Sequence, residues 1–189
     1  MYYYYRIART LNADTKVRFK LIDEVYAVRL KGADTTERLH SFAENVERIA
    51  CKIGKLQPKN GGPFSAVSKL LVHLHPIDGF IYDANARQTV KRILSTSTKI
   101  DGLETYRAFV RDYSTLFCEL KGHLEKQLNA QQGTLYPTHI IDKFLWLQGT
   151  EKADKDVRRL LRKKPSERHV ELASEITRWL KERQPELGW

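Results

Sequence analysis

One lysine and one aspartate stand in a strongly apolar part of the sequence, SKLLVHLHPIDGFIYDAN, which spans residues 68 to 85. Lys69 is followed by three aliphatic residues, and Asp83 follows the apolar triplet Phe-Ile-Tyr. Burial against such residues lowers the pKa of a lysine, because the charged form loses its hydration, and the neutral amine is a nucleophile. Lys69 is therefore a candidate nucleophile. The simpler interpretation is a solvated lysine and an aspartate that caps the next helix.

The elements that carry these two residues are predicted to be helices. Apolar residues recur at spacings of three and four over most of the chain, which is typical of amphipathic helices. Prolines and glycines predict a loop over 55–63 and end the helix of Lys69 at Pro76 and Gly79, and Asp83 is placed to cap the helix that follows. The predicted helices cover 15–31, 36–54, 64–75, 84–94, 103–130, 139–149, 151–164 and 167–183. The chain is therefore predicted to be all-α, a compact domain of about seven or eight helices.

Length and composition predict one main helical domain, residues 1–150, with a basic helical extension, 151–189, packed on the same domain. The 189 residues are 41% hydrophobic, enough for one substantial core. The sequence contains neither a stretch of eighteen apolar residues nor the pattern of a signal peptide, so a cytoplasmic protein without a membrane partner is expected. Cys51 and Cys118 are predicted to be core residues, and Trp146 is predicted to lie in the core or in the wall of a pocket.

The charge of the chain predicts a nucleic-acid partner. The net charge is +10 and the isoelectric point is near 9.6, and an excess of Lys and Arg attracts polyanions. The densest group of cations lies between residues 158 and 168, where Glu167 is the acidic residue among them, and it could neutralise several phosphates. These candidate nucleic-acid-binding residues are Arg158, Arg159, Arg162, Lys163, Lys164 and Arg168.

A local pattern in residues 60–95 adds a specific hypothesis. A loop with glycines is followed by a helix with Ser-Lys, then a proline, then an apolar triplet ending in the aspartate that starts the next helix. This pattern resembles the core of the helix-hairpin-helix DNA glycosylases of the 8-oxoguanine type. The resemblance implies that Lys69 attacks the sugar C1′ of a flipped nucleotide, that Asp83 stabilises the sugar cation, and that Gly61 and Gly62 lie near the phosphates. It implies a DNA N-glycosylase and AP lyase acting on a damaged or modified base.

Two alternatives stay open. The first is a noncatalytic helical module that binds nucleic acid or a partner protein, with Lys69 exposed and Asp83 only a cap. The second is a small helical ribonuclease or toxin-like factor, because Arg162 and His169 resemble the Arg-x(4–6)-His pattern of the HEPN class. No cofactor or metal site is predicted: phosphate-binding and dinucleotide glycine motifs are absent, and His73 and His75 would point apart on a helix. DNA is favoured over RNA.

Overall fold

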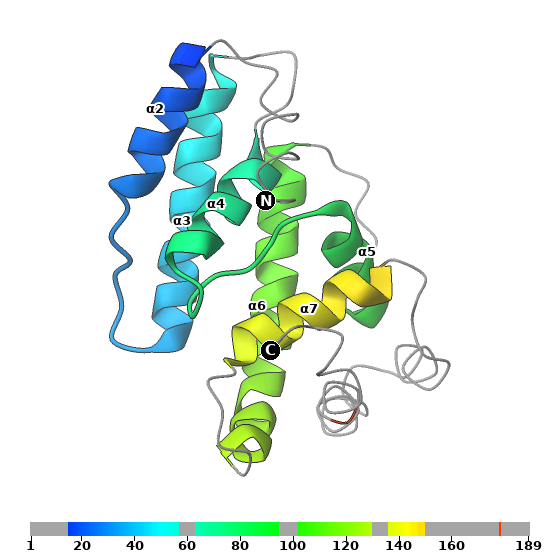
Figure 1. Ribbon diagram of the computed structural model, residues 1–189. Coiled ribbons are helices and arrows are strands. Elements are labelled where there is room, and N and C mark those ends of the chain that lie inside the picture. Colours follow the sequence, from blue (N-terminus) through cyan, green and yellow to red (C-terminus); the bar gives the residue numbers. More distant parts are fainter. Residues whose placement is uncertain (1–14, 57–62, 95–101, 130–135, 150–177, 179–189) are drawn as a thin grey trace. The chain divides into compact units, whose positions relative to one another are not determined.

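The computed structural model describes residues 15–56, 63–94, 102–129, 136–149 and 178, and the elements in these ranges are all α-helices (Figure 1). The six helices are α2 (Thr15–Tyr26), α3 (Thr35–Gly54), α4 (Phe64–Leu74), α5 (Ala84–Leu94), α6 (Leu103–Asn129) and α7 (Pro137–Gly149). The predicted all-α class is therefore confirmed. Apart from residue 178, the helices expected after residue 150 lie outside the described residues, so the predicted helix number and the division at residue 150 stay predictions.

The described residues group into two compact units. The first unit consists of two stretches of the chain. One contains α2, α3 and α4 and ends at Tyr82, and the other contains the part of α6 up to Val110. The second begins at Asp83 and contains α5, the part of α6 from Arg111 onward, and α7. None of the described helices is both long enough and apolar enough to cross a membrane.

In the first unit, α2 and α3 run side by side in opposite directions (Figure 1). Asp34 caps α3, because its carboxylate accepts the backbone N–H groups of Thr36 and Glu37 at 2.7 and 2.9 Å. An ion-pair group joins the two helices: Glu24 of α2 binds Arg48 at 3.0 Å and also binds Lys52 of α3.

The helix α2 is shorter than predicted, since it ends at Tyr26 rather than at residue 31. The guanidinium of Arg29 donates to the carbonyl oxygens of Tyr26 and Val28 at 3.0 and 2.9 Å, which satisfies acceptors that a continuing helix would have used. Gly32 has a φ of +132°, a backbone conformation that glycine adopts without strain. Helical periodicity in residues 27–31 was therefore misleading, because these residues connect α2 to α3 in a non-helical conformation.

Aromatic side chains form the centre of the first unit. Adjacent rings meet mostly edge to face, with centroids 5.2 Å apart for Phe42 and Phe80 and for Tyr82 and Phe109, geometries that aromatic pairs favour. Gly79 lets the chain pass close to this group, because a Cβ there would lie 2.6 Å from the ring of Phe42. We call this group the aromatic centre. Its members are Phe42, Phe64, Phe80, Tyr82, Tyr106 and Phe109.

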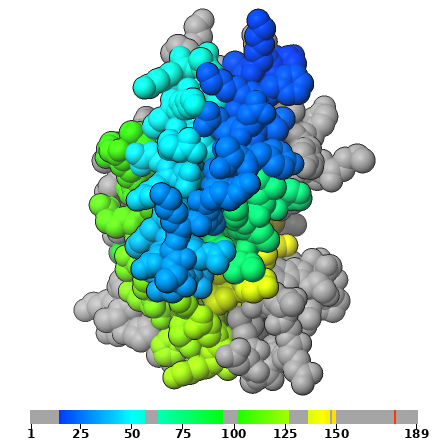
Figure 2. All heavy atoms as spheres, turned by 90° about the vertical axis from the view of Figure 1, so that its left-hand side faces the viewer, coloured from blue at the N-terminus to red at the C-terminus, as the bar shows by residue number. Residues whose placement is uncertain are grey.

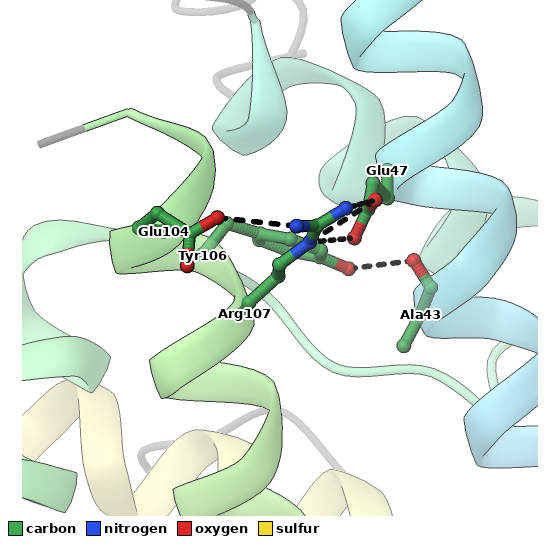
Figure 3. Close-up of polar contacts among 5 residues, drawn as sticks. All are labelled: Ala43, Glu47, Glu104, Tyr106 and Arg107. Carbon is green, nitrogen blue, oxygen red and sulfur yellow. Dashed lines mark hydrogen bonds and ion pairs between the residues drawn. The ribbon is translucent and has the colours of Figure 1, made fainter.

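The first turns of α6 attach to α3 through neighbouring residues with different roles (Figure 3). The buried Tyr106 donates its hydroxyl hydrogen to the carbonyl oxygen of Ala43 at 3.0 Å, and burial raises its pKa well above the ordinary value. The exposed Arg107 binds Glu47 through two nitrogens, the shorter contact being 2.6 Å, and also binds Glu104 of its own helix. At the start of α6, Tyr106 therefore belongs to the core, while the next residue, Arg107, forms an ion pair at the surface.

In the second unit, α5 packs against α7. The two backbones come very close at one point, since a Cβ on Gly149 would lie 2.5 Å from the Cβ of Asn85. The Arg92 guanidinium donates to the carbonyl oxygen of Gln148 at 2.9 Å, which places a cation at the negative end of α7. Trp146 of α7 is 42% exposed, so it is not a core residue, and its predicted alternative place in the wall of a pocket stays a prediction.

Candidate functional site

Lys69 lies on α4, whose buried face carries Phe64, Val67 and Leu71. The helix begins directly after Pro63 and ends at Leu74, before Pro76 and Gly79, so its predicted limits are confirmed to within one residue. Lys69 itself is half-buried at the edge of that face, whereas His73, one turn further along, is exposed. Part of the Lys69 side chain is therefore shielded from solvent, and its role as a nucleophile stays a prediction.

A fully buried serine fixes the segment between α4 and Tyr82. Ser68 donates its hydroxyl hydrogen to the carbonyl oxygen of Ser65 at 3.1 Å and accepts the backbone N–H of Tyr82 at 3.0 Å. Tyr82 in turn places its ring against Phe109 in the aromatic centre. The residue before Lys69 is thus bonded to the chain thirteen residues beyond Lys69, which holds α4 to the segment before α5 at the position next to the lysine. Sequence reasoning did not single out Ser68, although a serine on the apolar face of a helix is a signal for such a contact.

The turn that follows α4 forms a partly buried ion pair with α3. Asp78 is buried and binds Arg38 of α3 at 2.6 Å, while the Arg38 side chain is 45% exposed. His75 lies in the same turn, where the backbone N–H of Asp78 donates to its carbonyl oxygen. Burial lowers the pKa of His75, the nearby Asp78 opposes this change, and Arg38 and Arg29 reinforce it. No sequence pattern predicted that the turn after α4 would contain these polar contacts.

Asp83 caps α5, as predicted. Its carboxylate accepts the backbone N–H of Ala86 at 2.9 Å, and its carbonyl oxygen accepts the N–H of Arg87 at 3.0 Å. A carboxylate at this position also lies favourably at the positive end of the helix dipole. The confirmed role of Asp83 is therefore structural. Lys69 belongs to the first unit and Asp83 to the second, and their sharing one catalytic site stays a prediction.

The helix that Asp83 caps is cationic. Within α5 the charged residues are Arg87, Lys91 and Arg92, and no acidic residue occurs between its first and last positions. Arg92 is exposed and also bonds to the hydroxyl of Thr89 at 3.1 Å, whereas Arg87 and Lys91 are half-buried. Basic residues in the last turn are favourable for the helix itself, and they leave one helix of the second unit with a charge of a single sign.

Other predicted site residues lie outside the described residues. These are Gly61 and Gly62, the cations Arg158, Arg159, Arg162, Lys163, Lys164 and Arg168, and His169. In the described ranges, no group of three or more His, Cys, Asp or Glu side chains could hold a metal ion. Cys51 is half-buried, and Cys118 is exposed, so the prediction that Cys118 is a core residue was wrong.

Comparison with protein-family models, with curated proteins and with solved structures finds no match for this chain. The resemblance of residues 60–95 to the DNA glycosylases therefore stays a prediction that depends on the sequence pattern alone. The geometry of the described residues must carry any functional proposal.

Proposed function

We propose that this protein binds DNA, with its excess of cationic side chains directed at the phosphate backbone. The observation that carries the proposal is the charge of α5, which presents Arg87, Lys91 and Arg92 without an internal acidic residue. The carboxylate that precedes this helix, that of Asp83, is engaged in the helix cap. A short helix of one charge sign on a chain of net charge +10 favours contact with a polyanion.

The experiment is a salt series of binding affinities. We expect the logarithm of the affinity for a fluorescent 20-base-pair duplex to fall linearly with the logarithm of the salt concentration, by about 0.9 per neutralised phosphate. Replacement of both Arg87 and Lys91 by Gln should reduce the slope by about 2, because two phosphate contacts are lost. The matched control is Lys121→Gln with Lys126→Gln on α6 of the same unit, which should leave the slope unchanged.

Two outcomes would contradict the proposal. A response that does not change with salt would exclude phosphate contacts, and an unchanged slope in the α5 variant would exclude α5 as the interface. A single-stranded RNA of the same length, measured in parallel, tests the preference for DNA. Tighter binding of the RNA would instead favour the alternative of a small helical ribonuclease or toxin-like factor.

Our finer proposal is that the DNA-binding protein is a base-excision enzyme with Lys69 as nucleophile. The half-buried position of Lys69, on a helix whose backbone Ser68 fixes, supports it. In this reaction the Lys69 amine forms a bond to the sugar C1′ while the bond from C1′ to the base breaks. The base leaves with the bonding electron pair, and the amine loses a proton. Asp83 would stabilise the positive charge that develops on the sugar.

Borohydride trapping tests the finer proposal. We expect reduction to attach the protein covalently to a duplex containing 8-oxoguanine or an abasic site, and Lys69→Ala to abolish the adduct. Lys121→Ala on α6, outside the proposed DNA interface, is the matched control and should still form it. Asp83→Asn removes the charge but keeps an amide oxygen that caps a helix nearly as well, so it separates the electrostatic role from the cap. An adduct that survives Lys69→Ala excludes Lys69, and DNA binding without any adduct leaves a noncatalytic binding module.

A further inference from the structure

Helix α2 has two apolar faces, and one of them is exposed. Leu21 and Val25 are buried and hold the helix to the first unit. Phe19, Ile22 and Tyr26, at spacings of three and four residues, are 62%, 42% and 65% exposed. These spacings place the three side chains in one row, because the helix turns once every 3.6 residues. We call this row the α2 strip.

The α2 strip is large enough to need an explanation. Single exposed apolar residues are ordinary, whereas aligned ones form a continuous apolar surface that marks a contact site. Figure 2 shows α2 lying on the surface of the molecule on the side that faces the viewer. The eight residues of helix from Phe19 to Tyr26 extend for about 10 Å. That length fits two turns of one partner helix packed against α2.

The border of the α2 strip is mainly cationic. Lys16 and Lys20 are exposed residues of α2 itself, and Lys52 and Lys55 are exposed at the end of α3. The contact of Lys52 with Glu24 places this end of α3 beside the same part of α2. Glu24 is engaged by two cations of α3, and Asp23 is the other acidic residue of α2. Charge complementarity therefore favours an acidic occupant.

We propose that the α2 strip is the docking surface for an acidic amphipathic helix of a partner protein. The partner's apolar residues, at spacings of three and four, cover Phe19, Ile22 and Tyr26, and its carboxylates face Lys20 and Lys55. A second copy of this chain fits less well, since it would bring its own lysines against these. DNA fits less well because the strip offers an aliphatic and two aromatic side chains where a duplex presents phosphates. The proposal goes beyond DNA binding and does not depend on it.

The test uses the full chain and a synthetic probe. The probe is a fluorescent 18-residue helical peptide with leucines at spacings of three and four and glutamates on both flanks. We expect saturable binding by fluorescence anisotropy, with backbone amide shifts in the NMR spectrum concentrated in residues 15–26. A peptide of the same composition in scrambled order and a peptide with lysines in place of the glutamates should each bind at least tenfold more weakly.

Variants of the chain test the residues. The double variant Phe19→Ser with Tyr26→Ser should weaken peptide binding at least tenfold, and Lys20→Glu at least threefold. The matched control is Ile77→Ser, which alters an exposed apolar residue of the same unit outside α2 and should leave peptide binding unchanged. All three variants should keep the thermal midpoint of the parent, and the double variant and Ile77→Ser, which leave the charge unchanged, should also keep its affinity for duplex DNA. A loss of peptide binding with unchanged DNA binding therefore concerns this proposal alone.

Two contrary results would each identify another occupant. Binding of the chain to phosphatidylserine vesicles, lost in the double variant and without peptide binding, would assign the strip to a membrane surface. A dimer in sedimentation that the double variant abolishes would assign it to a second copy. Absence of saturable peptide binding up to 1 mM, or equal binding by the double variant and its parent, would overturn the proposal outright.

Discussion

The aromatic centre and the α2 strip contain the same kinds of side chain in the same unit, and their environments are opposite. Phe42 is fully buried and meets the ring of Phe80, whereas Phe19 of α2 is mostly exposed. The centre draws residues from α3, α4, α6 and the segment before α5, while the strip comes from one helix. This comparison shows that helical periodicity identifies an apolar face of a helix. Whether that face is buried depends on the other elements of the fold.

The largest expected effect contrasts the two regions directly. Phe42→Ala should lower the free energy of unfolding by about 3–5 kcal/mol, because it removes a buried ring and leaves a cavity beside Phe80. Phe19→Ala should change it by no more than about 0.5 kcal/mol, as for other exposed positions. Urea unfolding followed by circular dichroism measures both. Equal losses in the two variants would show that the α2 strip is part of the folded core and that the two regions do not differ in burial.

Much of the fold follows from local sequence signals. The apolar stripes of α3, α4 and α5 coincide with their buried faces, and Asp34 and Asp83 cap helices because an acidic side chain just before an apolar run accepts the first N–H groups. Local chemistry decides such features, so the sequence shows them. The end of α2 was missed because the side chain of Arg29 satisfies its last carbonyl groups, which no periodic pattern reveals.

The candidate site was less predictable than the fold. Lys69 could be recognised as a lysine in an apolar run, but its partial burial depends on elements that are distant in sequence. Ser68 and Asp78 were missed for the same reason, since their partners Tyr82 and Arg38 lie 14 and 40 residues away along the chain. The exposure of Phe19 and Tyr26 has the same origin, because it depends on which elements do not cover α2.

The next prediction concerns a polar contact at the edge of the aromatic centre. Ser68→Ala should lower the free energy of unfolding by about 1–3 kcal/mol, because the buried N–H of Tyr82 loses its acceptor. Ser65→Ala is the matched control on the same helix and should have a much smaller effect, since Ser68 bonds to the Ser65 backbone carbonyl and not to its side chain. Hydrogen exchange of the Tyr82 amide should become faster in Ser68→Ala alone. An unchanged exchange rate would mean that another group accepts this N–H.

Ion pairs on the two sides of the unit give a third contrast. Arg38→Ala leaves the buried Asp78 carboxylate without its guanidinium, and we expect a loss of about 1–3 kcal/mol, since Arg38 itself is only half-buried. Lys52→Ala on the α2 side removes one of two cations around an accessible Glu24 and should cost about 0.2–1 kcal/mol. Raising the salt concentration should reduce the second effect more than the first. Equal effects with equal salt dependence would show that Asp78 is not sheltered from solvent.

The smallest expected effects separate the two regions by pH. Burial lowers the pKa of His75 next to α4, so the folded chain binds fewer protons than the unfolded chain below the ordinary histidine value of about 6.5. The free energy of unfolding should therefore fall as the pH drops through about 6.5, and His75→Gln should remove this fall. The effect should stay below about 1 kcal/mol, because solvent screens the partly exposed His75.

On α2, the contacts of Glu24 with Lys52 and then Arg48 lower its pKa. Its stabilisation is present above about pH 4.3 and is lost as the pH falls through the folded-state value, so Glu24→Gln should lower the free energy of unfolding above about pH 4.3 and remove this fall in the acidic part of the curve. Urea unfolding between pH 7.5 and 3.5 distinguishes the two windows, and a change in the wrong window for either variant would show that the titrating group of that region has been misassigned.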